Sequence, residues 1–195
     1  KNYRVTAKKD GKEISVKAEL VINTAGRVPS IEDLDLEKGS VSFSKKGISV
    51  NKHLQNPTNE NVYACGDVSD SEGLPLTPLS SQEALIVIAN LLNTNKPEEV
   101  NYPPQPSIVF TLPNIASVGL SEKEAKEKGY DYTLEHKLVP TWFNAKRVNT
   151  EEYAYKTLVD KKTNLVLGAH LIGPEASEII NMFVMAMCGK LTCKE

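Results

Sequence analysis

The residue types best suited to chemistry are a glycine and an acid that follow a short apolar run, in Tyr63-Ala64-Cys65-Gly66-Asp67-Val68. We interpret residues 62–65 as a buried strand that ends in a Gly-Asp turn. Open α/β sheets bind their ligands at the carboxyl ends of strands. A carboxylate at that position accepts hydrogen bonds from ribose-like hydroxyls, which its apolar neighbours cannot do. Asp67 is therefore a candidate ligand-binding residue, and the alternative is a turn residue that caps its own loop.

The cysteines and histidines indicate neither a catalytic residue nor a metal site. Cys188 and Cys193 have a Cys-x-x-x-x-Cys spacing, and two thiols that close a short loop can undergo redox cycling. Cys65 lies inside an apolar run, which is typical of an inert core thiol. No metal-ligand spacing relates the three histidines, which are His53, His136 and His170.

Composition sets broad limits on the function. The chain has 195 residues, a net charge of -2 and scattered basic residues, which predicts no nucleic-acid partner and no anionic membrane surface. No apolar run approaches the roughly 20 residues that span a bilayer. Three cysteines do not make a disulfide framework, which favours a reducing compartment. We therefore expect a cytoplasmic protein.

The elements that position Asp67 are expected in the first hundred residues. A β-hairpin is predicted over residues 3–22, with its turn at Asp10-Gly11. Residues 47–50 form a short strand, and after Asp67 a helix begins near Thr77-Pro78, where proline suits the first turn. Ser80 and Glu83 could instead form a capping box. The apolar positions of this helix follow helical spacing at Leu85, Ile88, Ala89 and Leu92.

A second unit is predicted after Tyr102-Pro103-Pro104-Gln105-Pro106, a stiff extended connector. Five strands are expected at residues 107–110, 116–119, 132–139, 152–159 and 165–172, with a capped helix opening at Ser121. The final helix has Pro174 in its first turn and ends at Gly189. It is apolar on more than one face, with Met182, Met185 and Ala186 lying beside the stripe formed by Ile179, Ile180, Phe183, Val184 and Met187. Such a helix needs two buried faces, which favours self-association through the C-terminal part.

Seven short motifs occur in an order that resembles the C-terminal half of class I pyridine nucleotide-disulfide oxidoreductases, such as glutathione reductase, dihydrolipoamide dehydrogenase and mercuric reductase. They are Thr24-Ala25-Gly26-Arg27-Val28-Pro29, Cys65-Gly66-Asp67, Leu76-Thr77-Pro78, Val109-Phe110-Thr111-x-Pro113, Val118-Gly119-Leu120-Ser121-x-x-Glu124-Ala125, Gly168-Ala169-His170-Leu171-Ile172-Gly173 and Glu175-x-x-Glu178-Ile179-Ile180. The resemblance covers essentially the whole chain. It implies an α+β fold, in which the C-terminal part of the FAD/NAD(P)-binding region precedes an antiparallel sheet with helices. The implied domains are the closing strands of the NAD(P) domain (1–28), the second FAD-domain segment (29–100) and a truncated interface domain (102–195).

The same resemblance implies roles for particular residues. Gly66 and Asp67 would bind the ribityl chain of FAD, and the helix that opens at Leu76-Thr77-Pro78 would aim its N-terminus at the flavin ring. Free N–H groups and the positive dipole end at that position stabilise negative charge. Arg27 is interpreted as structural or near the cofactor, not catalytic. The parent enzyme would also use NADH or NADPH, reduce a disulfide substrate and form a homodimer through its C-terminal domain.

Several parts that the family needs do not occur in these 195 residues. Neither Gly-x-Gly-x-x-Gly loop is present, and the His-Glu acid-base pair would be expected shortly beyond Glu195. The spacing of Cys188 and Cys193 matches the family's redox pair, but the match lies at the wrong end of the chain. We therefore expect a fragment of a cell-redox flavoprotein, inactive alone. The alternatives are a non-catalytic dimerisation module and a thiol-redox protein that uses Cys188 and Cys193.

Overall fold

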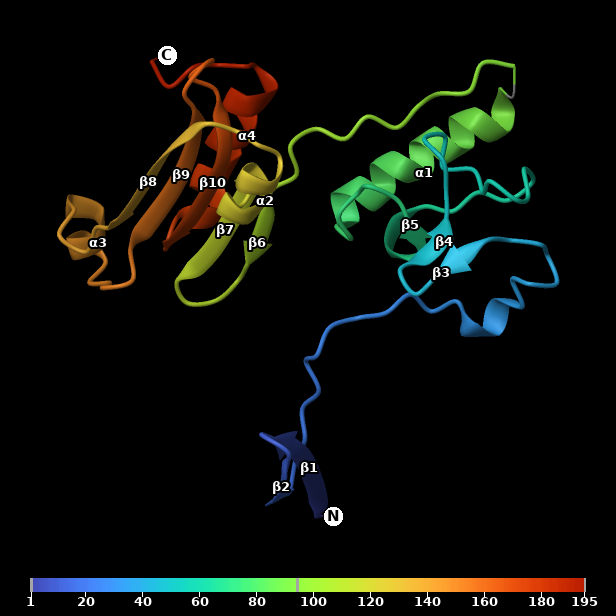
Figure 1. The fold of residues 1–195 in the computed structure, drawn as a ribbon, viewed down its shortest axis with the longest axis horizontal. Helices are drawn as coiled ribbons and strands as arrows, with labels where there is room; N and C mark the ends of the chain where they lie inside the picture. Colours follow the sequence, from blue (N-terminus) through green and yellow to red (C-terminus); the bar gives the residue numbers. More distant parts are fainter. Residues whose placement is uncertain (1, 94, 195) are drawn as a thin grey trace.

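The computed structural model describes residues 2–93 and 95–194, and Figure 1 shows three successive parts of an α+β chain. The outer limits of the first and last expected domains, Lys1 and Glu195, lie outside the described residues. No helix in the described ranges is long and apolar enough to cross a membrane.

The N-terminal part is the expected hairpin, formed by β1 (Tyr3–Lys9) and β2 (Lys12–Ala18). Asp10 and Gly11 both have positive φ angles, 51° and 76°, which is the conformation of a type I′ turn. The second strand was expected to continue to Ile22, but it ends at Ala18, which pairs with Tyr3, the first residue of β1. The three apolar residues of 20–22 are consequently exposed.

The middle part contains a small three-stranded sheet, two short 3-10 helices and one long helix. In chain order they are η1 (Glu32–Leu34), β3 (Phe43–Ser44), β4 (Gly47–Ser49), η2 (Gly66–Val68), β5 (Ser69–Asp70) and α1 (Thr77–Leu92). Strand β4 pairs antiparallel with β3 and parallel with β5. The expected strand over residues 62–65 is wrong: Tyr63 makes one isolated bridge, to Gln55. Ala64 nevertheless packs in the local core with Leu36, Val41 and Ile48.

Helix α1 begins at Thr77 with proline in its first turn, as the sequence predicts. Its buried residues, however, are Leu79, Glu83 and Asn90. The apolar positions that predicted the helix are largely exposed: Leu85 by 68%, Ile88 by 52% and Leu92 by 83%. The helix therefore turns a face with two polar residues toward the rest of this chain.

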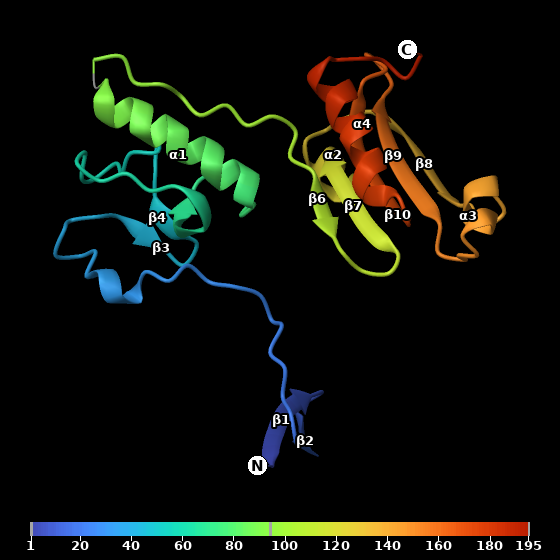
Figure 2. The same cartoon turned by 180° about the vertical axis from the view of Figure 1, so that it is seen from behind.

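The C-terminal part is a five-stranded antiparallel sheet with the strand order β6-β7-β10-β9-β8. The strands are β6 (Ser107–Val109), β7 (Asn114–Gly119), β8 (Tyr132–Leu138), β9 (Ala154–Asp160) and β10 (Val166–Gly173). Helix α4 (Ala176–Cys188) packs across β7 and β10 (Figure 2). Ile180, fully buried, joins Val118 and Ala169 in the core beneath this helix.

The shorter helices and the helix ends add two confirmations and two corrections. Helix α2 (Glu122–Glu127) has the expected capping box, because Ser121 and Glu124 bond each other reciprocally. Helix α3 (Phe143–Arg147) was not predicted. Pro174 lies before α4 rather than in its first turn. At its other end α4 stops at Gly189, as expected; Gly189 has a φ of -78°, and the next residue, Lys190, takes the left-handed position with a φ of 52°.

Candidate functional site

The turn that carries Asp67 is held against helix α1. Gly66, the first residue of η2, has a φ of +71°. A Cβ added there would lie 3.0 Å from Ser80 Oγ on α1, so a side chain at this position would meet the helix. Glycine therefore meets two needs, the left-handed backbone and the close approach of α1.

The Asp67 carboxylate is half exposed and lies at the edge of a hollow of about 830 Å³. Its Oδ2 lies 2.7 Å from Nη2 of Arg27, whose side chain is 75% exposed. Exposed ion pairs of this kind contribute little, about 0–1 kcal/mol, so ligand groups can compete for the carboxylate. We call this space the turn hollow; it is lined by residues 27–30, 45–46, 66–71, 73 and 75.

The N-terminus of α1 follows the turn hollow directly, since Pro75 lines the hollow and Leu76 caps the helix. Leu76 has an extended backbone, and no side chain hydrogen-bonds this cap. The first turn of α1 contains no acidic residue. Within the described residues, the positive dipole end at Leu76, Thr77 and Pro78 is therefore not neutralised by the helix itself. The lining residues do not include these three, so the structure brings the helix start next to the hollow rather than into it.

Glu83 is a site residue whose environment the sequence did not reveal. Its side chain is buried, with 2% exposure, and its Oε2 accepts a 2.6 Å hydrogen bond from the backbone N–H of Gly66. Its Oε1 accepts from Ser71 Oγ at 2.8 Å and from the phenol of Tyr102. The alternative capping box is therefore not formed, and Ser80 Oγ donates to the carbonyl of Leu76. The sequence carried no periodic signal for this position, because Glu83 is buried through hydrogen bonds to residues distant in sequence.

These contacts shift two pKa values. Burial, followed by the hydrogen bond to Glu83, raises the pKa of Tyr102 to about 12. Burial, followed by the charge of Glu83, raises the pKa of the Cys65 thiol above its usual range. A raised pKa keeps the Cys65 thiol protonated and unreactive at neutral pH, although Cys65 is only partly buried rather than part of the core.

The remaining thiols and histidines are dispersed. Cys188 and Cys193 are free and exposed. His53 contacts the carbonyl of Glu98, whereas His136 and His170 both lie opposite Lys156 on one face of the C-terminal sheet, closer in space than their sequence separation suggested. No group of three His, Cys, Asp or Glu side chains in residues 2–93 and 95–194 is placed to hold a metal ion.

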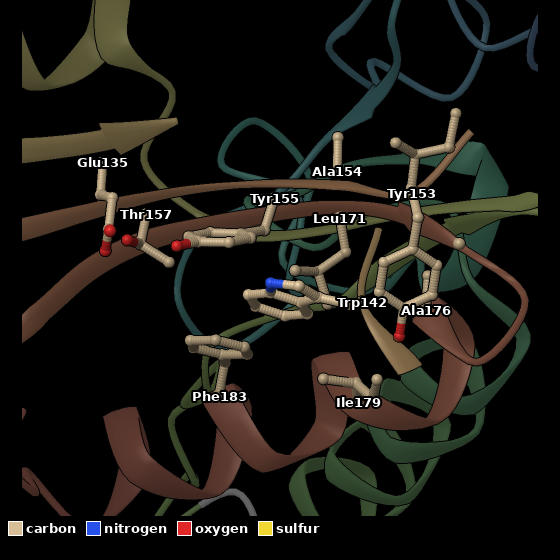
Figure 3. A pocket seen from close by; sticks show the side chains of 12 residues that line it. Glu135, Trp142, Tyr153, Ala154, Tyr155, Thr157, Leu171, Ala176, Ile179 and Phe183 are labelled. Atoms are coloured by element: carbon tan, nitrogen blue, oxygen red, sulfur yellow. The ribbon is translucent and has the colours of Figure 1, made fainter. Parts of the chain in front are cut away.

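The C-terminal part has an apolar hollow of about 300 Å³ between its sheet and α4 (Figure 3). Trp142 lies against Tyr155, with ring centroids 5.7 Å apart, and Phe183 of α4 lines the same space. On α4 itself, Met182 and Met185 are 70% and 72% exposed. This part of the molecule therefore presents apolar surface that its own residues do not cover.

Comparisons with known proteins agree with one another. Residues 1–84 match the family model described as pyridine nucleotide-disulphide oxidoreductase, and residues 105–195 match the dimerisation domain of that family. The chain is 44% identical over 162 residues to an uncharacterized 19.7 kDa protein in a mercuric resistance operon of Staphylococcus aureus, a match that covers 83% of this chain and 89% of that protein.

Several longer relatives carry the names of enzymes. The chain is 33% identical over 192 residues to a dihydrolipoyl dehydrogenase of Bacillus subtilis, covering 98% of this chain and 40% of that enzyme. It is 35% identical over 191 residues to mercuric reductase of Staphylococcus aureus, covering 95% and 34%. Among solved structures, the HOCl-induced flavoprotein disulfide reductase RclA from Escherichia coli superposes with a TM-score of 0.78 at 27% identity, covering 97% of this chain and 42% of that one. The chain thus spans well under half of these longer proteins.

Proposed function

Since this chain belongs to the class I pyridine nucleotide-disulfide oxidoreductase family, we propose that it supplies the flavin-contacting turn and the dimer interface of an FAD-dependent NAD(P)H:disulfide oxidoreductase. The observation that carries this proposal is the placement of the Asp67 carboxylate at the turn hollow, directly before the uncapped N-terminus of α1. The relatives' names refer to dihydrolipoyl groups and to mercuric ion, so we assign the substrate only to the disulfide class that the family shares.

The residues present fit the part of FAD assigned to them. The ribityl chain of FAD is a row of hydroxyls, and Asp67 offers a half-exposed acceptor whose ion pair with Arg27 is weak enough to exchange. The pyrimidine side of the flavin ring becomes negative on reduction, and the start of α1 offers uncapped N–H groups and a positive dipole end. When bound, FAD supplies the transfer of electrons from nicotinamide to a disulfide. The chain's own residues would bind and orient the flavin.

We further propose that the chain has no oxidoreductase activity on its own. It contains neither Gly-rich loop for the pyrophosphates of FAD and NAD(P)H, so the nucleotide-binding parts of the enzyme must come from other residues. The exposed thiols Cys188 and Cys193 have no part in the proposed chemistry. Three free thiols in one chain fit a reducing compartment, and we place the protein in the cytoplasm.

An NMR titration of the chain with FAD tests the proposal, because amide shifts detect even millimolar binding. We expect shifts at residues 66–68 and at the first turn of α1, and we expect them to be much smaller in Asp67→Asn. Asp70→Asn is the matched control: Asp70 also lines the turn hollow, but its carboxylate is bonded by Ser44 Oγ. Equal shifts in both variants, or shifts confined to other residues, would overturn the role of Asp67.

The second candidate function, dimerisation, is favoured by the exposed apolar surface of the C-terminal part. Met182 and Met185 are exposed on α4, the helix whose Phe183 lines the apolar hollow, and monomers rarely leave large apolar patches uncovered. We propose a homodimer through this surface, whether or not flavin is bound. Sedimentation of the chain should give a dimer, and Met182→Glu with Met185→Glu should give a monomer. Leu138→Glu is the control, since Leu138 is exposed but points to the opposite face of the sheet from Glu135, which lines the hollow.

A further inference from the structure

The buried carboxylate of Glu83 is unusual in the middle part of this chain. Glutamate is seldom fully buried, and no ion pair among residues 2–93 and 95–194 includes Glu83. Instead, three hydrogen-bond donors surround it: the Gly66 backbone N–H on Oε2, and the hydroxyls of Ser71 and Tyr102 on Oε1. Such charge-assisted bonds offset the loss of hydration that burial imposes.

The bond to Gly66 fixes the residue next to Asp67. The backbone nitrogen of Gly66 lies 2.6 Å from Oε2 of Glu83. The same glycine also lies close to Ser80, one turn earlier on α1, since a Cβ added to it would be 3.0 Å from Ser80 Oγ. Two contacts from one helix therefore set the position of the turn. Because Asp67 follows directly, these contacts also set where its carboxylate lies at the turn hollow.

The bond to Tyr102 brings the connector into the same cluster. Tyr102 lies five residues before β6, at the entry to the C-terminal part. The segment before the connector is also fixed, because Asn90 of α1 bonds the backbone of Glu98 in both directions. Within the connector, Gln105 accepts from the N–H of Leu74. The connector is thus held along α1, and Tyr102 is the point at which it contacts the carboxylate that holds Gly66.

We propose that Glu83 is the positioning residue of the Gly66–Asp67 turn, and that Tyr102 transmits the docking of the connector to that turn through the Glu83 carboxylate. The part of this inference that concerns flavin rests on the proposed function of Asp67. The part that concerns the turn does not, because it is a statement about the position of Gly66 in the chain without ligand.

Hydrogen exchange of the Gly66 amide, measured by NMR on the full chain, tests the positioning directly. We expect exchange to be at least about tenfold faster in Glu83→Ala, since a bond to an ionised acceptor is lost. Glu83→Gln should keep most of the protection, because its amide oxygen can accept from Gly66 while its NH₂ donates to the two hydroxyls. Tyr102→Phe should speed exchange by an intermediate amount. Ser81→Ala, on the exposed face of α1, should change nothing.

The pKa of Tyr102 gives a second readout in Glu83→Gln, the variant that keeps the size of the side chain and therefore the burial of the phenol. In Glu83→Gln the phenol loses its hydrogen bond to a carboxylate and the charge of Glu83, so its pKa should fall from about 12, while burial, the largest cause, and the charge of Glu72 still hold it above the ordinary value. Gly66 exchange at the wild-type rate in Glu83→Ala would overturn the inference, and the wild-type rate in Tyr102→Phe would overturn the role of the connector. If Glu83→Ala does not fold, the pKa of Tyr102 in Glu83→Gln and the exchange rate of the Gly66 amide in Tyr102→Phe test the inference instead.

An FAD titration of the same variants separates this inference from the proposed function. We expect Glu83→Ala to need about tenfold more FAD to shift the Asp67 amide. If Gly66 exchange responds to the variants but FAD affinity does not, Glu83 positions the turn and the contact between Asp67 and flavin is refuted.

Discussion

Replacing Gly66 by alanine tests how closely α1 holds the turn that carries Asp67. The φ of +71° is left-handed, a conformation that costs an L-residue about 1–2 kcal/mol. The new Cβ would also lie 3.0 Å from Oγ and 3.2 Å from Cβ of Ser80, and displacing that side chain adds about 1 kcal/mol or more. We expect Gly66→Ala to lower the free energy of unfolding of the middle part by about 2–3 kcal/mol.

Gly129→Ala is the matched control for this substitution. Its φ is +73°, nearly the same as that of Gly66, but nothing lies within 4 Å of the added Cβ. It should therefore lose only the backbone contribution, about 1–2 kcal/mol. Urea unfolding followed through the amide resonances of α1 for Gly66, and of α2 for Gly129, measures the two losses separately. Equal losses would refute the close contact between the turn and α1.

Three further predictions concern helix α4 and the pH dependence. Lys190→Gly should stabilise the C-terminal part by about 1 kcal/mol in urea unfolding, since glycine takes the left-handed position after α4 without strain; a loss of stability would contradict the assigned end of the helix. Ile180→Ala should cost about 2–4 kcal/mol because Ile180 is fully buried, whereas Leu138→Ala, at a 69% exposed position outside the proposed interface, should change stability by no more than about 0.5 kcal/mol. The pKa of Tyr102 is raised on folding, so the unfolded chain releases this proton first, and the stability due to Tyr102 should be lost as the pH rises from 10 toward 12. Denaturation across that range should show this loss in the wild type and not in Tyr102→Phe.

The sequence predicts the C-terminal sheet well, because the alternation of apolar and polar residues and the turn residues between the strands determine each strand locally. All five strands lie near their expected positions, and the capping box at Ser121 is present. Helix α3 was missed because five residues are too few to show helical periodicity. Helix α4 ends as predicted, with Gly189 as its C-cap, but the left-handed residue that follows is Lys190 rather than a glycine.

In the middle part, the sequence predicts the elements of the site better than their surroundings. The Gly-Asp turn and the start of α1 at Thr77-Pro78 follow from residue types, but the strand expected before the turn does not form. The apolar spacing of α1 located the helix without indicating its inner face, since Glu83 and Asn90 are buried through hydrogen bonds to Gly66 and His53, which are distant in sequence. Contacts of that kind leave no periodic signal, which is why Glu83 became visible only in the structure.

The most direct measurement is of nuclear Overhauser effects between bound FAD and the amide protons of this chain. If Asp67 binds the ribityl chain, those sugar protons should give effects to the amides of Asp67 and Val68, and Asp67→Asn should abolish them while Asp70→Asn keeps them. Effects from the flavin to Trp142 and Phe183 alone, or none near the turn hollow at saturating FAD, would contradict the assignment of this chain as the flavin-contacting part of a disulfide reductase.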